Sequence, residues 1–271
     1  MKKAFSNLLH WLISMRVPEL AEIVVSLTVS LLDRRLTRAH WDGEDWGFTW
    51  SDGCLFSHSH QIRPKFVTQQ NIGLYLTKYK PKPGDIVVEV GAGTGTEVCT
   101  LSNLVGPTGR VIAIEADPTA VRLLRKQAHQ LQYSNVTVVE TAVGERESTL
   151  NLSIGSPGGV GNSTAARISD KTISVPCRPL KNVLDEVGID HISFIKFNIE
   201  GAEYEALIGL GSAVRKTEHI FVSCHDFTGI PGQATFEDVY GYLQSQGMKL
   251  ATLPPNPDKP WEEFYIFAEW G

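Results

Sequence analysis

The sequence predicts an α/β fold in which a mostly parallel sheet carries helices on both faces. The chain has 271 residues, of which 42% are hydrophobic and 20% are charged, as is usual for globular proteins. From residue 66 onward, short apolar runs alternate with segments of helical periodicity, which is typical of parallel strands buried on both faces. One apolar run leads directly into three alternating glycines and then a helix, as in many ligand-binding α/β proteins. We therefore expect an α/β domain over residues 66–271, preceded by an N-terminal extension over residues 1–65.

The extension combines helical and aromatic segments. Residues 1–38 carry apolar side chains at helical spacing, so we expect them to pack against the domain or to form a homodimer contact. Peripheral contact with a membrane surface is the alternative. The longest apolar stretch, residues 23–32, is shorter than the roughly 20 residues of a membrane span, and the N-terminus shows no signal-peptide pattern. The sequence thus predicts a cytoplasmic protein with no transmembrane segment.

Residues 41–56 are predicted to form short strands joined by turns, with a hairpin turn at Asp52-Gly53. Three of the six tryptophans, at positions 41, 46 and 50, lie in this segment. They form either a small core beneath a loop or a pocket for a sugar or macrocycle. His58 and His60 follow, and side chains at this spacing on a strand point the same way. Because no third metal ligand is identifiable, we interpret them as structural or substrate-loop histidines.

The elements of the α/β domain follow from its periodicity. The pattern predicts helices at 66–79, 97–104, 118–131, 180–187, 202–210 and 235–246, and strands at 86–90, 110–114, 136–139, 193–197, 219–224, 249–253 and 263–269. Two further strands, 148–154 and 173–177, alternate polar and apolar residues and interrupt this order. The glycine- and serine-rich loop between them, residues 155–166, is predicted to close over the active site.

The strongest local signal is the strand–turn–helix segment from residue 87 to residue 97, which contains Gly91, Gly93 and Gly95. Glycine permits a sharp turn and a close approach of ligand to backbone, and the helix N-terminus offers free N–H groups to an anion. Dinucleotide-binding proteins usually have a glycine where this chain has Thr96.

Two acidic residues narrow the choice of ligand. Glu115 ends the next strand, 20 residues after Gly95, where a carboxylate can accept hydrogen bonds from both ribose hydroxyls. Glu89 lies inside an apolar strand, where its charge is costly unless it is paired. A cationic amino-acid group on the ligand would be a suitable partner. A ribose and an α-amino acid together favour S-adenosylmethionine, with NAD and a purely structural turn as the alternatives.

Four blocks of the sequence, GDIVVEVGAGTGTE, IAIEADP, ETAVGE and FIKFNIEGAEYEAL, resemble the FkbM family of S-adenosylmethionine-dependent methyltransferases over residues 70–226. The resemblance implies a Rossmann-like class I methyltransferase fold, with seven strands of which the last is antiparallel. It also implies methyl transfer to a hydroxyl of a sugar or another small natural product, with S-adenosylhomocysteine as the product. The acidic segment of the family corresponds to Glu200 and Glu203. Two positions depart from the family, since Asn198 replaces its usual aspartate and Gly93 its usual asparagine.

The predicted cofactor site comprises Glu89, Gly91, Gly93, Thr94, Gly95, Glu97, Glu115, Ala116, Thr141, Ala142 and Asn198. The resemblance assigns Glu115 to the ribose and Ala142 to the adenine edge.

The predicted catalytic residues are His225, Glu200, Asp226 and Asn198, which follow two neighbouring strands at their carboxyl ends. An alcohol is a poor nucleophile, so a base or a metal is usually required. His225 is the first choice for the base, since an ordinary histidine pKa of about 6.5 suits neutral conditions. Glu200 either contacts the acceptor, holds a divalent ion with Asp226, or is a helix N-cap residue. Glu203 is expected in the first turn of a helix. A metal is thus an alternative that no sequence motif supports.

Charge and cysteine content restrict the partners. The formal net charge is −5, which argues against a nucleic-acid partner and leaves a small-molecule or glycan acceptor. None of the four cysteines forms a CxxC pair, so we expect buried thiols in a reducing compartment. An N-methyltransferase, an NAD-dependent oxidoreductase and a non-catalytic protein that binds S-adenosylmethionine are the competing hypotheses.

Overall fold

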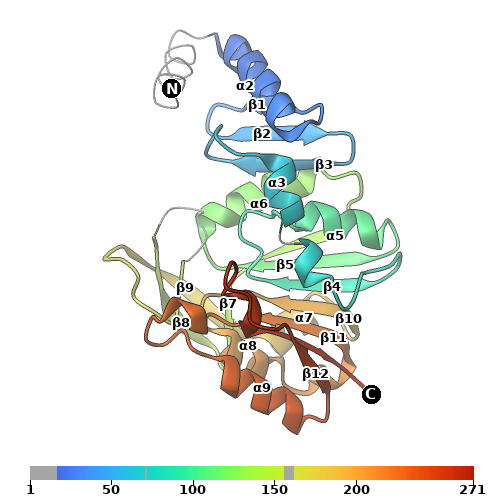
Figure 1. Ribbon diagram of the computed structural model, residues 1–271, viewed down its shortest axis with the longest axis vertical. Helices are drawn as coiled ribbons and strands as arrows, with labels where there is room; N and C mark the ends of the chain where they lie inside the picture. The colour runs from blue at the N-terminus through green and yellow to red at the C-terminus, as the bar shows by residue number, and fades with distance from the viewer. Residues whose placement is uncertain (1–16, 71, 156–161) are drawn as a thin grey trace.

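The computed structural model describes residues 17–70, 72–155 and 162–271 (Figure 1). The extension contains helix α2 (Pro18–Asp33) and a three-stranded antiparallel sheet of β1 (Arg38–Trp41), β2 (Trp46–Trp50) and β3 (Gly53–Ser57). Strand β3 packs against two helices of the α/β domain, α5 (Val98–Val105) and α6 (Pro118–Gln130). The extension therefore sits on one helical layer of the domain, at the upper end of the molecule in Figure 1.

The extension is less helical than predicted. Its described helix ends at Asp33, five residues before the predicted end, and Arg38 begins a strand. Residues 1–16, which belong to the same prediction, lie outside the described residues. The hairpin turn is Ser51-Asp52, one residue earlier than predicted, since Gly53 pairs with Trp50 across the two strands. Gly53 serves packing instead, because a Cβ there would collide with the Trp50 ring.

The tryptophans of the extension belong to a small core. Trp46 is buried, and Trp41 and Trp50 pack around it together with the inner face of α2. The described residues therefore favour the core interpretation of these tryptophans over a pocket.

The α/β domain is built on a seven-stranded sheet of order β12-β13-β11-β10-β4-β5-β6. The strands are β4 (Ile86–Val90), β5 (Arg110–Glu115), β6 (Val136–Glu140), β10 (Ile192–Phe197), β11 (Thr217–Ser223), β12 (Lys249–Thr252) and β13 (Tyr265–Glu269). Strands β6, β5, β4, β10 and β11 pair in parallel, and β13 is antiparallel to both of its neighbours. The predicted topology, including the antiparallel last strand, is confirmed.

Helices cover both faces of this sheet (Figure 1). One face packs against α7 (Leu180–Glu186), α8 (Glu203–Leu210) and α9 (Phe236–Ser245), and the other against α4 (Ile72–Tyr75), α5 and α6. In β4, Val88 and Val90 face the helices α7, α8 and α9, and Val87 faces the opposite layer of helices. Both sides of each central strand are thus buried, which explains its continuous apolar run.

Most predicted elements end within two residues of the observed bounds, and three differences stand out. The helix expected over 66–79 begins earlier, at Pro64, and ends earlier, at Tyr75; its described parts are α3 (Pro64–Gln70) and α4, on either side of residue 71, which lies outside the described residues. Strand β7 (Ala142–Gly144) was not predicted. It pairs in parallel with β9 (Thr172–Pro179), which also pairs with β8 (Ser148–Ser153), so the inserted strands form a separate sheet.

All four cysteines are free and buried. Within the described ranges, no helix is long and apolar enough to cross a bilayer.

Candidate active site

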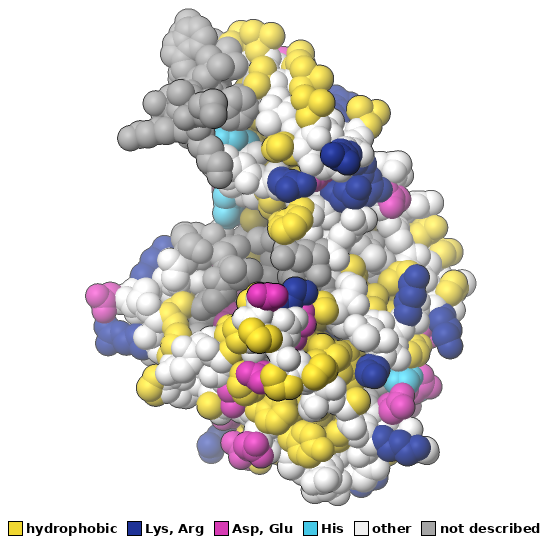
Figure 2. Space-filling view, viewed as in Figure 1, with side chains coloured by type: hydrophobic (Ala, Val, Ile, Leu, Met, Phe, Trp, Pro, Cys, Tyr) yellow, Lys and Arg dark blue, Asp and Glu magenta, His cyan; other side chains and the backbone are white. Residues whose placement is uncertain are grey.

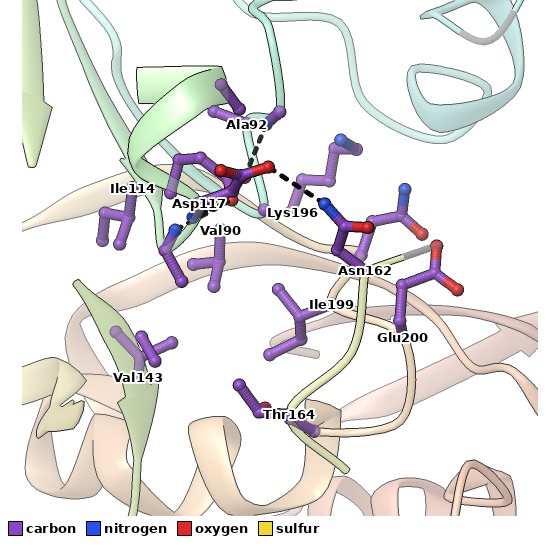
Figure 3. A pocket seen from close by; sticks show the side chains of 18 of the residues that line it. Val90, Ala92, Ile114, Asp117, Val143, Asn162, Thr164, Lys196, Ile199 and Glu200 are labelled. Atoms are coloured by element: carbon purple, nitrogen blue, oxygen red, sulfur yellow. Dashed lines mark hydrogen bonds between the residues drawn. The ribbon is translucent and has the colours of Figure 1, made fainter. Parts of the chain in front are cut away.

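A cavity opens at the carboxyl ends of β4, β5 and β10, the position at which α/β proteins bind ligands. Figure 3 shows side chains from these three strands and from the loops that follow them directed into one space. The lining residues are Tyr75, Val90, Gly91, Ala92, Gly93, Thr94, Thr96, Glu97, Ile114, Glu115, Ala116, Asp117, Ala120, Thr141, Ala142, Val143, Leu152, Asn162, Thr164, Lys196, Asn198, Ile199, Glu200 and Ala202. Nine of the eleven predicted cofactor residues are among them, and Glu89 and Gly95 are the two that are not.

The floor of the cavity is the glycine turn between β4 and α5. All three glycines have positive φ, a conformation that glycine adopts without strain. Gly91 also has no room for a side chain, because a Cβ there would overlap the backbone carbonyl oxygen of Asn198. The two strand ends are therefore held in contact, which brings the loop after β10 beside the glycine turn.

Glu115 lies at the end of β5 and faces the cavity. One carboxylate oxygen accepts the Gly93 N–H at 2.8 Å, and the other accepts the N–H groups of Ala116 and Asp117 at 2.8 Å each. Burial raises the pKa of Glu115, and these hydrogen bonds oppose the rise. A carboxylate has about four acceptor sites, of which these N–H groups use three, so Glu115 keeps about one site for a hydroxyl group of a ligand.

The loop that follows β8 reaches the other side of the cavity. Asn162 donates a hydrogen bond to Asp117 at 3.0 Å, the dashed line in Figure 3, and Thr164 also lines the cavity. These two residues belong to the loop predicted to close over the site, of which residues 156–161 lie outside the described residues.

Glu89 is fully buried, and one of its carboxylate oxygens pairs within the chain, whereas the other has no hydrogen-bond partner among the described residues. Lys196, opposite it on β10, lies 3.1 Å from one carboxylate oxygen, and its ammonium stands over the Tyr75 ring. Burial raises the pKa of Glu89 to about 7 despite Lys196. A cationic ligand group, which the sequence suggested as one suitable partner of Glu89, would find Lys196 already beside one carboxylate oxygen. The sequence signal for Lys196, a lysine inside an apolar strand, was missed.

Glu200 has a strained backbone and faces the cavity. Its φ is 57°, and Arg34 is the other described non-glycine residue with positive φ. The backbone carbonyl of Glu200 accepts hydrogen bonds from Ser163 Oγ at 2.7 Å and Gln233 Nε2 at 3.2 Å, which hold this conformation. Such strain is typical of functional sites. Glu200 is not the helix N-cap, which is Ala202.

His225 lies behind Glu200, between two carboxylates. Its Nδ1 is 2.8 Å from Glu203 Oε1, and its Nε2 is 3.3 Å from Glu200 Oε2. Burial opposes the imidazolium, but these two carboxylates raise the pKa of His225 to about 10. His225 is therefore protonated at neutral pH, contrary to the ordinary pKa expected from the sequence. It is also absent from the described lining of the cavity.

Glu203 is fully buried in the first turn of α8, as predicted, and holds the surrounding chain. Its carboxylate accepts the N–H groups of Ile199 and Gly201 and the hydroxyl of Thr235, in addition to its contact with His225. The acidic segment is thus tied to the loop after β11.

Asp226 has a structural role in the described chain. One carboxylate oxygen accepts the backbone N–H groups of Thr235 and Phe236 at 3.0 and 3.1 Å, which caps the start of α9. Among the residues that the structure describes, no cluster of three metal-ligating side chains exists. The alternative in which Glu200 and Asp226 hold a divalent ion thus gains no support from the described residues.

The two histidines after β3 contact other residues of the extension. His58 bonds the buried carboxylate of Asp45 at 2.6 Å, and His60 lies against the Trp46 ring. Both contacts agree with a structural role.

The sequence matches the FkbM methyltransferase domain family over residues 89–250, more than half of the chain. The chain belongs to the FkbM methyltransferase family. The FkbM domain carries the glycine turn, Glu115 and the Glu200–Glu203 segment within this range.

A solved structure of an FkbM methyltransferase from Methylobacillus flagellatus KT is similar to this chain, with a TM-score of 0.52 at 20% identity. The likeness covers 73% of this chain and 47% of the other. At this identity it shows the fold alone, and the class I methyltransferase fold expected for an FkbM protein is confirmed.

Two curated relatives match shorter segments. A protein-L-isoaspartate O-methyltransferase from Aeropyrum pernix is 38% identical over 74 residues, which is 27% of this chain and 28% of that protein. A probable cobalt-precorrin-6B C(15)-methyltransferase from Sulfolobus acidocaldarius is 37% identical over 78 residues, or 29% and 39%. The chain thus spans well under half of the length of these relatives.

Proposed function

We propose that this FkbM protein is an S-adenosylmethionine-dependent methyltransferase that acts on a hydroxyl group of a small molecule or glycan. The observation that carries this proposal is one cavity shared by the residues predicted for the cofactor and those predicted for the acceptor. Glu115, Thr141 and Ala142 reach it from the ends of β5 and β6, and Asn198 and Glu200 reach it from the end of β10.

The residues present fit the cofactor. The positive-φ glycines let a ligand approach the backbone closely, Glu115 has about one spare acceptor site for a ribose hydroxyl, and Ala142, which the resemblance assigns to the adenine edge, lines the cavity. When bound, S-adenosylmethionine supplies a methyl group on a sulfonium, which is a good leaving group. The protein then has mainly to align the acceptor with that methyl group.

Glu200 is the better candidate for the base than His225. Its carboxylate faces the cavity with 22% of the side chain exposed, whereas the His225 side chain is 4% exposed and already protonated. With S-adenosylmethionine and an acceptor bound, Glu200 would accept the hydroxyl proton as the methyl group passes to the acceptor oxygen, with S-adenosylhomocysteine as the leaving group. His225 positions Glu200, and Glu203 in turn positions His225.

The test is calorimetric titration of S-adenosylhomocysteine and NAD into the wild-type chain and Glu115→Gln. Because hydrogen bonds to a charged group contribute about 1.5–3 kcal/mol, we expect Glu115→Gln to weaken the binding of S-adenosylhomocysteine at least about tenfold. Glu140→Gln is the matched control, since Glu140 lies opposite Glu115 on β6 and is outside the described cavity lining. Binding of NAD but not of S-adenosylhomocysteine would support the oxidoreductase alternative instead.

Glu200→Gln separates binding from transfer in the same experiment. This variant should bind S-adenosylhomocysteine almost as the wild type does, but transfer methyl groups to a hydroxyl acceptor about 100-fold more slowly, the lower range of general base catalysis. Binding without turnover on sugar and polyketide acceptors by the wild type would favour the non-catalytic alternative. Unchanged turnover in Glu200→Gln would remove Glu200 as the base.

A further inference from the structure

Helix α2 has an apolar face that the described chain leaves uncovered. Leu20, Ile23, Leu27 and Leu31 recur every three or four residues on this face and are between 51% and 78% exposed. Figure 2 shows hydrophobic side chains gathered over α2 at the upper end of the molecule. The opposite face of the helix, with Ala21, Val25 and Val29, is buried on the sheet of the extension.

An exposed negative charge stands at one end of the uncovered face, and an exposed positive charge stands at the other end. Glu19 lies in the first turn of α2, and Arg34 is the residue that caps its last turn. Both are exposed. Neither has an ion-pair partner among the described residues, whereas the neighbouring Arg35 and Arg63 pair with Asp52 and Asp33.

We propose that this face binds a second copy of the chain, with the two α2 helices antiparallel across a twofold axis. In a twofold interface each residue meets the partner's copy of another residue, and the reverse contact is equivalent. The antiparallel arrangement brings Glu19 of one copy to Arg34 of the second copy, twice, and it places the two copies of Leu27 near the axis. The spacing of the leucines is that of helices packed along a seam.

Charge favours this occupant over a lipid surface. An anionic bilayer attracts faces bordered by basic residues, but Glu19 stands at one end of this face. Because the two ends carry opposite charges, an antiparallel copy of the same helix places each charge opposite its complement. Because one helix pair is small among protein interfaces, we expect a dimer that forms at micromolar concentrations.

The test is the mass of the full chain in solution, by light scattering after gel filtration, over a concentration series. The wild type should approach twice 29.9 kDa at high concentration. Glu19→Lys and Arg34→Glu should each raise the dissociation constant about tenfold, and the double variant Glu19→Lys/Arg34→Glu should restore it. Leu27→Asp should raise it about 100-fold, and circular dichroism checks that each variant is folded.

Asp170→Lys is the matched control, because it makes the same change of charge at a side chain that is 99% exposed and far from α2 in sequence. It should leave the mass unchanged. A wild type that stays monomeric throughout the series, or a double variant no better than the singles, overturns the proposal. A monomeric chain that floats with phosphatidylserine vesicles would also overturn it, if Arg34→Glu weakens and Glu19→Lys strengthens this binding. That result would assign the face to lipid.

Discussion

At the scale of single residues, the arrangement of Glu200, His225 and Glu203 differs most from the expectation. A histidine after a parallel strand is a reasonable base on sequence grounds, since its ordinary pKa lies near neutrality. Both of its ring nitrogens face carboxylates in the structure, which stabilises the imidazolium and removes the acceptor nitrogen that a base requires. The proton-accepting role moves to Glu200, the member of the group that reaches the cavity.

The raised pKa of His225 predicts a pH-dependent stability. The folded-state pKa is about 10 and the unfolded value is about 6.5. The stabilisation is therefore fully present below pH 6.5 and is lost as the pH rises through 10. We expect His225→Gln to lower the free energy of unfolding by on the order of 2–4 kcal/mol at pH 6, with a much smaller difference from the wild type at pH 10.5.

Urea unfolding of both proteins between pH 6 and pH 10.5 measures this difference. His191→Gln is the control, because His191 is an exposed histidine paired with the exposed Glu218, and its loss should cost less than about 0.5 kcal/mol. A difference between wild type and His225→Gln that stays constant with pH would contradict the pairing.

At the scale of elements, the strand–turn–helix unit of β4, the glycine turn and α5 is the best predicted part of the molecule. Its bounds follow from local rules, since a buried strand, glycines with positive φ and a helix occur within one short segment. Strand β7 was missed because three residues carry too little periodicity to be recognised.

Gly91 is the position where this strand–turn–helix unit packs closely against the backbone of Asn198, at the end of β10. Gly91→Ala would force a Cβ into the Asn198 carbonyl at a φ of 80°, so we expect a loss of unfolding free energy on the order of 3 kcal/mol and weaker S-adenosylhomocysteine binding. Gly106→Ala is the control, because Gly106 also has positive φ but nothing within 4 Å of a Cβ. Thermal unfolding and calorimetry measure both. Equal losses in the two variants would show that backbone strain, rather than contact with Asn198, limits the position.

At the scale of the whole molecule, buried charge joins the extension to the α/β domain. Asp45, fully buried at the start of β2, contacts Arg122 and Lys126 of α6 as well as His58. The two contacts with α6 do not follow from the sequence, because Arg122 and Lys126 are 77 and 81 residues from Asp45 along the chain. The extension is therefore held in a defined place on α5 and α6.

Asp45→Asn should loosen this junction. The neutral side chain leaves two cations without their buried partner, so we expect a loss of about 2 kcal/mol and faster amide hydrogen exchange in β2 and β3 than in β4 and β5. Glu44→Gln is the control in the same ion-pair group, because Glu44 is 62% exposed and such pairs contribute under about 1 kcal/mol. Exchange rates that rise equally in all four strands would contradict a local junction.

The sequence by itself determined the alternation of strands and helices, the glycine turn and the position of Glu115, because each follows from a pattern within a few neighbouring residues. It also carried the resemblance to the FkbM family. The tertiary structure alone decided that Lys196 pairs with Glu89, that Glu200 rather than His225 faces the cavity, and that the extension rests on α5 and α6. These features depend on contacts between residues far apart in the chain, and local periodicity contains no information about which distant charges meet.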